Sequence, residues 1–512
     1  MTDEIGSEMS RRTFSRLMGA AAVGAALPDR SLGTTPRSAT PVANTADDAL
    51  CDMTAVDLAA RIRSRQVSAR EVMSAHLARI ERVNPRVNAI VTLVAERAMA
   101  DAAKADEAQA RGDKLGPLHG LPVAHKDLVN TAGIRTTRGS RFYKDLVPTT
   151  DALIVTRIRA AGAITLGKTN TPEFGAGSQT FNEVFGATRN PYDLTKTVGG
   201  SSGGAAASLR CGLVPIADGS DTGGSLRNPA AFCNIVGLRP SPGRVAREGG
   251  IWSPLSVSGP MARTVGDVAL FLSAIAGPDG GDPLSLPEPG SRFAAPLARD
   301  MRGVRIAWWR GLGGIPFEPE ITRVVNASRH VFEDLGCIVE EAEPDFSGVA
   351  DAFSTLRHLS YHSSYAPLLR ERAEWVKDTI KWEIAQAERN TGADVAAASV
   401  RQNGLFDQTH QFFERYEYFV LPVTQVSPFD VTTPYPTQIN GQPMATYIDW
   451  MRSCSYVSLM TNPAISVPCG FTSSGLPVGL QIVGRHRNDW SVLQMAHAFE
   501  TATRHGERRP SP

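Results

Sequence analysis

The chain has 512 residues, of which 42% are hydrophobic and 21% are charged, and this is the composition of an ordinary globular protein. It excludes a wholly disordered chain, a collagen-like fibre and a long coiled coil. The 53 Lys and Arg residues against 52 Asp and Glu residues give a net charge of +1, so we expect no nucleic-acid partner.

The N-terminal 46 residues are predicted to be an export leader. Residues 10–17 read Ser-Arg-Arg-Thr-Phe-Ser-Arg-Leu, and a short apolar run rich in Ala and Gly follows at 18–27. A basic segment before a brief apolar run is typical of a signal peptide, and the adjacent arginines resemble the twin-arginine signal, which exports folded proteins. We therefore expect a periplasmic or secreted protein. A basic tail with no export role is the alternative, and the cleavage site stays open.

The next residues alternate between helical and strand-like patterns. Ser68 and Glu71 form a capping-box pattern that predicts a helix ending at Asn84-Pro85. A strand is expected over 87–93 and a helix over 94–111, closed by a glycine. Residues 150–161 predict a helix and 163–166 a short buried strand. This rhythm predicts an α/β fold, and no later stretch is long and apolar enough to span a bilayer.

Residues 350–450 are predicted to be helical and are rich in large aromatic side chains, which more often fill a core than line a substrate site. These aromatics are Tyr361, Trp375, Trp382, Phe406, Phe412, Tyr416 and Trp450. The spacing of the six cysteines suits neither a disulfide scaffold nor structural zinc, so we interpret them as packing residues or a few optional bridges. They are Cys51, Cys211, Cys233, Cys337, Cys454 and Cys469.

Three motifs suggest other chemistries. Residues 162–169 match the phosphate-loop pattern G-x4-G-K-[ST], but the predicted helix precedes the first glycine and the strand fills the variable positions, which is the wrong context for nucleotide binding. His358 and His362 lack the glutamate of the metalloprotease motif H-E-x-x-H, so we expect solvated or substrate-facing histidines and no metal. Residues 199–203 match the G-x-S-x-G nucleophile elbow, which would make Ser201 the nucleophile.

A different combination explains more of the chain. Three segments of the sequence are considered as one set. They are Gly-Leu-Pro-Val-Ala-His-Lys-Asp at 120–127, Gly-Gly-Ser-Ser-Gly-Gly at 199–204 and Gly-Ser-Asp-Thr-Gly-Gly-Ser-Leu-Arg at 219–227. Hydrolysis of an unactivated amide needs a nucleophile, a base that can return a proton to the leaving nitrogen, and donors for the oxyanion. The small residues before Ser225 allow several backbone amides to converge on one point. Lys126 stands among apolar neighbours, and burial there would lower the pKa of its amine toward the working pH.

With these segments the chain resembles the amidase signature family. Further blocks match it in order, at 229–233, 236–240, 259–264, 463–468 and 475–484. The resemblance covers most of residues 53–500. It implies one domain over 47–512, with a central mixed, twisted sheet flanked by helices. The signature core would lie at about 115–270 and a variable helical substrate region at about 350–450.

The resemblance also implies the site residues. Ser225 would be the nucleophile, Ser201 the bridging serine after a cis peptide bond, and Lys126 the base. The backbone amides expected to form the oxyanion hole are those of Thr222, Gly223, Gly224 and Ser225. Supporting roles would fall to Ser202 and to Asp221 with Arg227. The family chemistry uses no metal and no organic cofactor.

The expected function is hydrolysis of carboxamide bonds of small molecules through an acyl-enzyme. Related activities in the family stay open: cyclic-amide or nylon-oligomer, aryl-acylamide, peptide-amide, fatty-acid-amide and carbamate hydrolysis. The amidase subunit of the glutamyl-tRNA amidotransferase is a less favoured alternative, because the leader argues against it and its glutamine-binding aspartate falls on Met451, with Asp449 two residues away. From another class, a catalytically silent binding protein is disfavoured because all three triad residues are present. Family members are often dimers, so a homodimer is a further expectation.

Overall fold

The computed structural model describes residues 46–248 and 252–512. The predicted leader with its twin-arginine motif lies outside the described residues, so it stays a prediction, as does the domain boundary at residue 47. Within the described ranges, every helix is too short or too polar to cross a bilayer.

A large mixed β-sheet forms the centre of the described part of the chain. It has 11 strands in the order β1-β3-β2-β8-β10-β9-β16-β17-β13-β11-β12. Strand β2 pairs parallel with β3 and β8, whereas β10 pairs antiparallel with β8 and β9. The strand bounds are β1 Ile90–Leu93, β2 Pro122–Lys126, β3 Ile164–Thr169, β8 Ile216–Asp221, β9 Val236–Arg239, β10 Val257–Ala262, β11 Arg305–Trp308, β12 Ile338–Glu341, β13 Tyr418–Pro422, β16 Ala464–Phe471 and β17 Pro477–Gly484. The predicted single α/β domain with a mixed central sheet is confirmed.

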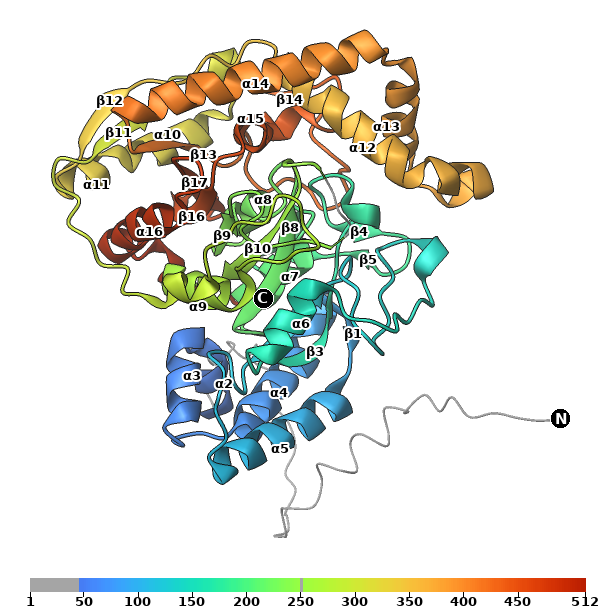
Figure 1. Cartoon of the computed structure of the whole chain (residues 1–512), viewed down its shortest axis with the longest axis vertical. Helices are drawn as coiled ribbons and strands as arrows, with labels where there is room; N and C mark the ends of the chain where they lie inside the picture. Colours follow the sequence, from blue (N-terminus) through green and yellow to red (C-terminus); the bar gives the residue numbers. More distant parts are fainter. Residues whose placement is uncertain (1–45, 249–251) are drawn as a thin grey trace, which may run out of the picture. The chain divides into compact units, whose positions relative to one another are not determined.

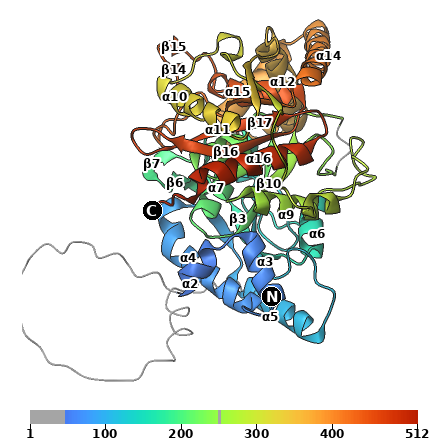
Figure 2. The same ribbon diagram turned by 90° about the vertical axis from the view of Figure 1, so that its left-hand side faces the viewer.

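Helices flank this sheet (Figures 1 and 2). The blue helices α2 to α5 lie at the end of the molecule near β1 and β3, and the orange helices α12 to α14 lie at the opposite end. Helix α16 lies across β16 in Figure 2. The helix bounds are α2 Ala46–Asp52, α3 Ala55–Arg63, α4 Ala69–Val87, α5 Ala95–Arg111, α6 Leu153–Ala160, α7 Gly203–Arg210, α8 Arg227–Phe232, α9 Val265–Ile275, α10 Pro319–Ala327, α11 Arg329–Asp334, α12 Val349–Glu371, α13 Asp378–Arg389, α14 Gly392–Arg415, α15 Arg452–Met460 and α16 Asp489–Thr503.

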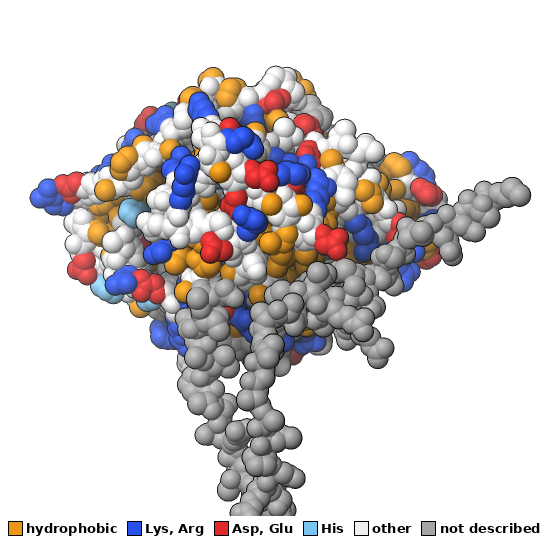
Figure 3. All heavy atoms as spheres, turned by 90° about the horizontal axis from the view of Figure 1, so that it is seen from below, with side chains coloured by type: hydrophobic (Ala, Val, Ile, Leu, Met, Phe, Trp, Pro, Cys, Tyr) orange, Lys and Arg blue, Asp and Glu red, His pale blue; other side chains and the backbone are white. Residues whose placement is uncertain are grey.

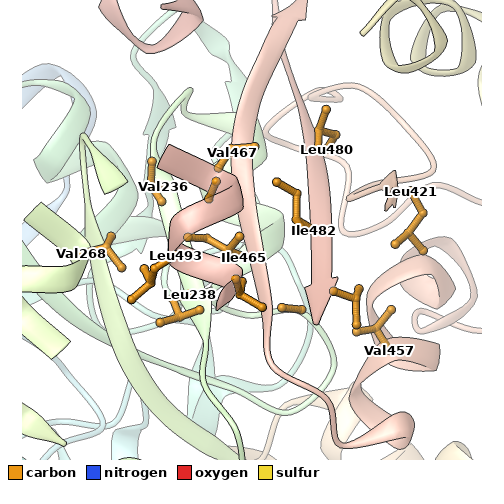
Figure 4. Packing of buried hydrophobic residues seen from close by; sticks show 14 of the residues in the cluster. Val236, Leu238, Val268, Leu421, Val457, Ile465, Val467, Leu480, Ile482 and Leu493 are labelled. Atoms are coloured by element: carbon orange, nitrogen blue, oxygen red, sulfur yellow. The ribbon is translucent and has the colours of Figure 1, made fainter. Parts of the chain in front are cut away.

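The main hydrophobic core lies between the sheet and its covering helices. Figure 4 shows Val236 and Leu238 of β9 beside Ile465 and Val467 of β16, with Leu493 of α16 packed against them. All of these side chains are buried. At the surface drawn in Figure 3, cationic and anionic side chains are interspersed, in keeping with the balanced charge of the chain.

The local predictions hold except at one helix end and in the last part of the region predicted to be helical over 350–450. Helix α14 ends at Arg415, and the fully buried apolar run Tyr418–Pro422 forms strand β13 between β11 and β17 of the central sheet. The capping box of Ser68 and Glu71 is present at the start of α4. The predicted stop at Asn84-Pro85 is wrong, because α4 continues through Pro85 to Val87 and ends at Asn88, whose φ is +52°. The Asn84 side chain accepts hydrogen bonds from the amides of residues 89 and 90, at 2.9 and 2.8 Å, and so organises the turn after the helix. A polar side chain that bonds to backbone beyond a helix end imitates a stop signal in the sequence.

The six cysteines all lie in the described part of the chain, where they are buried and free of disulfides. This agrees with the interpretation of packing residues.

Candidate active site

Lys126 ends strand β2, which is buried along its whole length. Its side chain is fully buried, and its amine faces hydroxyl groups: Nζ lies 2.7 Å from Oγ of Ser201, 2.9 Å from Oγ of Ser202 and 3.0 Å from Oγ of Ser220. Burial lowers the pKa of Lys126 to about 7, against the opposing influence of the carboxylates of Asp221 and Asp218. A large share of these amines is therefore uncharged near neutral pH, as the apolar neighbours in the sequence predicted.

The segment before α7 carries Ser201 to this amine. The peptide bond between Gly200 and Ser201 is cis, as the resemblance implied. Two hydroxyls hold the preceding backbone: Ser178 donates to the carbonyl of Gly200 at 2.6 Å, and Thr180 donates to the carbonyl of Gly199 at 2.8 Å. Gly175, whose φ is +74°, packs against Ser201, and a Cβ on residue 175 would lie 3.3 Å from Ser201 Oγ. The bridging position is thus fixed by its surroundings.

Ser225 stands in the turn between β8 and α8. The Asp221 carboxylate folds this turn, because it accepts hydrogen bonds from the amides of Gly224 at 2.8 Å and Leu226 at 3.2 Å. The amide of Ser202 donates to the carbonyl of Ser225 at 3.3 Å and ties the two serine segments together. Gly224 has φ +123°, and a Cβ there would lie 2.6 Å from the Cβ of Cys454, so glycine is required.

Two arginines neutralise the buried carboxylate of Asp221. Arg227 forms an ion pair with it at 3.0 Å and Arg239 another at 3.3 Å. All three side chains are fully buried. These guanidinium groups outweigh the desolvation of the carboxylate and hold the pKa of Asp221 below its usual range. The predicted pair of Asp221 and Arg227 is present, and Arg239 is a second cation that sequence reasoning missed.

The backbone amides around Ser225 differ in what they bond. Within the described residues, the amides of Thr222, Gly223 and Ser225 have no protein acceptor, whereas that of Gly224 donates to Asp221. Three neighbouring donors therefore remain available to an oxygen atom bound beside Ser225.

Ser201, Ser220 and Ser225 open into one cavity of about 330 Å³, called here the serine pocket. Phe174 and Leu128 supply apolar wall, and Arg357 and Tyr361 reach it from helix α12. This volume suits a small organic molecule. Of the aromatics in the helical region, Tyr361 lines the pocket and Trp450 is buried in the core.

Comparison with known proteins identifies the family. The family model described as Amidase matches residues 71–493. The chain belongs to the amidase family. An acylamidase of Rhodococcus erythropolis is 38% identical over 464 residues, which cover 90% of this chain and 97% of that protein. A glutamyl-tRNA(Gln) amidotransferase subunit from Moorella thermoacetica is 37% identical over 488 residues, covering 90% and 98%. The crystal structure of a bacterial aryl acylamidase of the amidase signature family matches with a TM-score of 0.83 and 30% identity, over 89% of this chain and 98% of that one.

These matches confirm the predicted enzyme class: the amidase hydrolyses amide bonds. Sequence reasoning brought Lys126 and Ser201 together correctly as neighbours, and placed Ser225 in the same pocket. It missed Ser220, the third hydroxyl at the amine, although this residue lies within the 219–227 segment, directly before Asp221. It also missed Ser178 and Thr180, which lie outside the Gly-rich segments and give no local signal.

The other motifs of the amidase have structural explanations. Residues 164–169 form strand β3 after helix α6, and the amine of Lys168 donates to the carbonyl of Val129 and, at 2.8 Å, to Oγ1 of Thr131. This context is that of a buried strand, as predicted. His358 is buried with its ring edge-to-face against Trp382, and it lies 3.5 Å from a carboxylate oxygen of Glu383. The expectation of a solvated or substrate-facing side chain is therefore wrong for His358. Among the described residues, no cluster of His, Cys, Asp or Glu side chains has the arrangement of a metal site.

Proposed function

We propose that this amidase hydrolyses carboxamide bonds of small molecules through a triad of Lys126, Ser201 and Ser225. The observation that carries the proposal is the buried amine of Lys126, whose pKa is lowered to about 7 and whose nearest hydroxyl, at 2.7 Å, belongs to Ser201. A neutral amine in contact with a hydroxyl can accept its proton. The elbow interpretation of Ser201 as nucleophile is less favoured, because the backbone amides left without an acceptor, those of Thr222, Gly223 and Ser225, lie beside Ser225.

The hydrogen bonds around the amine support Ser201 as the proton donor to it. A neutral amine donates two hydrogen bonds and accepts one. The Ser202 hydroxyl lies 3.4 Å from the carbonyl of Ser220, to which it donates, so it receives a hydrogen bond from Lys126. The lone pair of the amine is then left for a hydroxyl that can donate, and Ser201 is the closest.

In the acylation step, Ser225 Oγ attacks the amide carbonyl and forms a carbon–oxygen bond. Its proton passes to Ser201 Oγ while the proton of Ser201 passes to Nζ of Lys126. The relay then reverses, Ser201 protonates the leaving nitrogen, and the carbon–nitrogen bond breaks to give an acyl-enzyme. Water cleaves the ester by the same route and releases the carboxylate.

The oxyanion formed in each step is stabilised by backbone amides. We assign this role to Thr222, Gly223 and Ser225, whose amides have no acceptor within the described residues, and the amide of Gly224 holds the turn through Asp221. Asp221 and Arg227 act on the shape of the turn and not on the reacting atoms. Ser202 supports the amine through its hydroxyl.

Small carboxamides and anilides are the proposed substrates, since the relatives include acylamidases and the serine pocket measures about 330 Å³. Hydrolysis of 4-nitroacetanilide, followed by 4-nitroaniline release, tests the activity. The mechanism requires that Ser225→Ala and Lys126→Ala abolish turnover while the circular dichroism spectrum is unchanged. Normal turnover in either variant would contradict it.

A role within a glutamyl-tRNA(Gln) amidotransferase is the second candidate, because one of its subunits is 37% identical over most of the chain. The position expected to bind glutamine holds Met451, which is buried. Asp449 is engaged elsewhere, with Arg452 at 2.7 Å and the amide of Thr446 at 2.9 Å. Release of ammonia from glutamine at a rate above that from simple carboxamides would favour the second candidate.

We also propose export by the twin-arginine route and assembly as a homodimer. The export proposal rests on Arg11 and Arg12, and replacing both with lysine is expected to retain the protein in the cytoplasm with its leader uncleaved. Light scattering of the purified protein tests the dimer.

A further inference from the structure

The serine pocket carries an unpaired positive charge. Arg247 lines it together with Ser201 and Ser225. Within the described residues, no carboxylate lies close enough to Arg247 to form an ion pair, and no Asp or Glu lines this pocket. The guanidinium donates one hydrogen bond, from Nη1 to the carbonyl of Ser256 at 2.6 Å, so its other nitrogens remain available to a ligand.

Burying the guanidinium of Arg247 without a counter-ion lowers the stability of the folded protein. Desolvation lowers the pKa of Arg247, and Asp282 opposes this only through space, since its carboxylate accepts from the backbone amide of Arg247 at 2.9 Å and not from the guanidinium. A charged group that loses water without gaining a counter-ion destabilises the folded state. An anionic ligand in the pocket would remove this cost.

A second arginine that lines the serine pocket, Arg357, differs from Arg247 because its charge is paired. Arg357 also lines the pocket, but its Nε lies 2.7 Å from Oε1 of Glu383 and its Nη2 donates to the hydroxyls of Tyr361 and Tyr447, at 3.0 and 2.9 Å. Its charge is neutralised inside the protein, and its role is to build the wall. Arg247 has no such partner within the described residues.

We propose that Arg247 is a specificity-determining residue and that the preferred substrates are amides bearing a carboxylate, which pairs with its guanidinium when the amide carbonyl lies at Ser225. This deepens the proposed function and rests on it for the placement of the scissile bond. Arginine is suited to the role because its planar fork can bind both oxygens of a carboxylate.

Matched substrate pairs test the inference, because each pair differs by a carboxylate against an isopropyl group of the same size. On the acyl side, the 4-nitroanilides of succinic acid and 4-methylpentanoic acid form one pair. On the amine side, 4-acetamidobenzoate and 4-isopropylacetanilide form the other. We expect kcat/KM of the anionic member to exceed that of the neutral member at least tenfold in one pair, and this preference to fall as salt is raised.

Arg247→Gln is expected to lose the preference for the anionic substrate. Its kcat/KM for the anionic member should fall at least tenfold, and its kcat/KM for the neutral member should change less than threefold. Arg247→Lys, which keeps the charge, is expected to retain part of the preference. Arg65→Gln is the matched control. Arg65 also donates to a backbone carbonyl, that of Gln109 at 2.9 Å, and it lines a separate pocket. Its replacement should leave kcat/KM unchanged for both members of a pair.

The inference is overturned if the neutral member is preferred in both pairs, or if Arg247→Gln slows both members equally. The salt dependence of the wild-type preference needs no variant and keeps the test decisive if Arg247→Gln fails to fold. Calorimetric binding of the same four amides to Ser225→Ala protein separates the two proposals: a preference for the anionic amides there supports the Arg247 assignment even if none is hydrolysed, and its absence overturns it.

Discussion

Strands β2 and β3 each carry a buried lysine near their C-terminal end, Lys126 and Lys168, and the two side chains have different surroundings. The strands are parallel neighbours, with Lys126 opposite Thr169 and Lys168 opposite His125. Both side chains are fully buried, and burial lowers the pKa of Lys126 to about 7 and that of Lys168 to about 8. Burial alone therefore does not distinguish a base from a structural lysine.

The partners of the two amines do distinguish them. Lys126 faces three hydroxyls, and a hydroxyl can give up a proton to an amine. Lys168 donates to the carbonyl of Val129 and the hydroxyl of Thr131, and the buried carboxylate of Asp127 favours its charged form. A carbonyl can only accept, and the Thr131 hydroxyl donates its own proton to the Val129 carbonyl at 3.2 Å, so both groups accept from Lys168, which stabilises the fold as a donor. This comparison implies that the two lysines respond in opposite ways to substitution.

The largest expected effect is on catalysis at Lys126. Lys126→Met should lower kcat by about 10⁴-fold or more, because the loss of one member of a catalytic relay stops proton transfer through the others. Its thermal stability should stay within about 1 kcal/mol of the wild type or rise, since an apolar side chain suits a buried site. Anilide turnover and calorimetric melting measure the two effects. A variant with substantial activity would remove the distinction between the lysines.

Ser201→Ala is expected to reduce kcat by about 10³-fold or more, because Lys126 then lacks the hydroxyl that carries the proton to and from Ser225 in the proposed relay. Ser220→Ala is the matched control, since it removes another hydroxyl at 3.0 Å from the same amine and has no place in the relay. We expect it to lower kcat by less than about tenfold. Equal losses in the two variants would show that the three hydroxyls act only as a common environment for the amine.

The sequence predicted the part of this comparison that depends on local chemistry. Lys126 among apolar residues indicated a lowered pKa, and the helix before Gly162 excluded a phosphate loop around Lys168. The third hydroxyl, at Ser220, depends on the pairing of β2 with β8, and the second cation, at Arg239, depends on the pairing of β8, β10 and β9. These strands are distant in the sequence, so no local pattern indicates the contacts. The run of α4 through Pro85 could not be predicted, because the Asn84 side chain bonds to backbone beyond the helix.

The pH dependence of kcat/KM should report Lys126. The base must be uncharged, so activity should fall about tenfold per pH unit below its pKa of about 7 and level off above it. Stopped assays of acetanilide hydrolysis between pH 5 and 9 measure this profile. In Lys168→Met the midpoint should move by less than about half a pH unit, because the charged groups that act on the pKa of Lys126 are the carboxylates of Asp221 and Asp218. A profile that is flat from pH 5 would contradict the assignment of the base.

Lys168→Met is expected to have the smallest effect on catalysis and a clear effect on stability. Its loss removes the charged donor from the Val129 carbonyl, which keeps only the Thr131 hydroxyl at 3.2 Å, and removes a cation that stabilises the Asp127 carboxylate; together these should cost about 3 kcal/mol of unfolding free energy. The kcat of the folded variant should stay within about tenfold of the wild type. Urea unfolding and anilide turnover test both statements, and a stable but inactive Lys168→Met would reverse the roles of the two lysines.

The most direct test of the relay is to identify the residue that a fluorophosphonate labels, by mass spectrometry of the digested protein. We predict a single adduct on Ser225 in the wild type, the same adduct in Lys168→Met, and none in Lys126→Met. An adduct on Ser201, or labelling of Ser225 at the wild-type rate without Lys126, would contradict it.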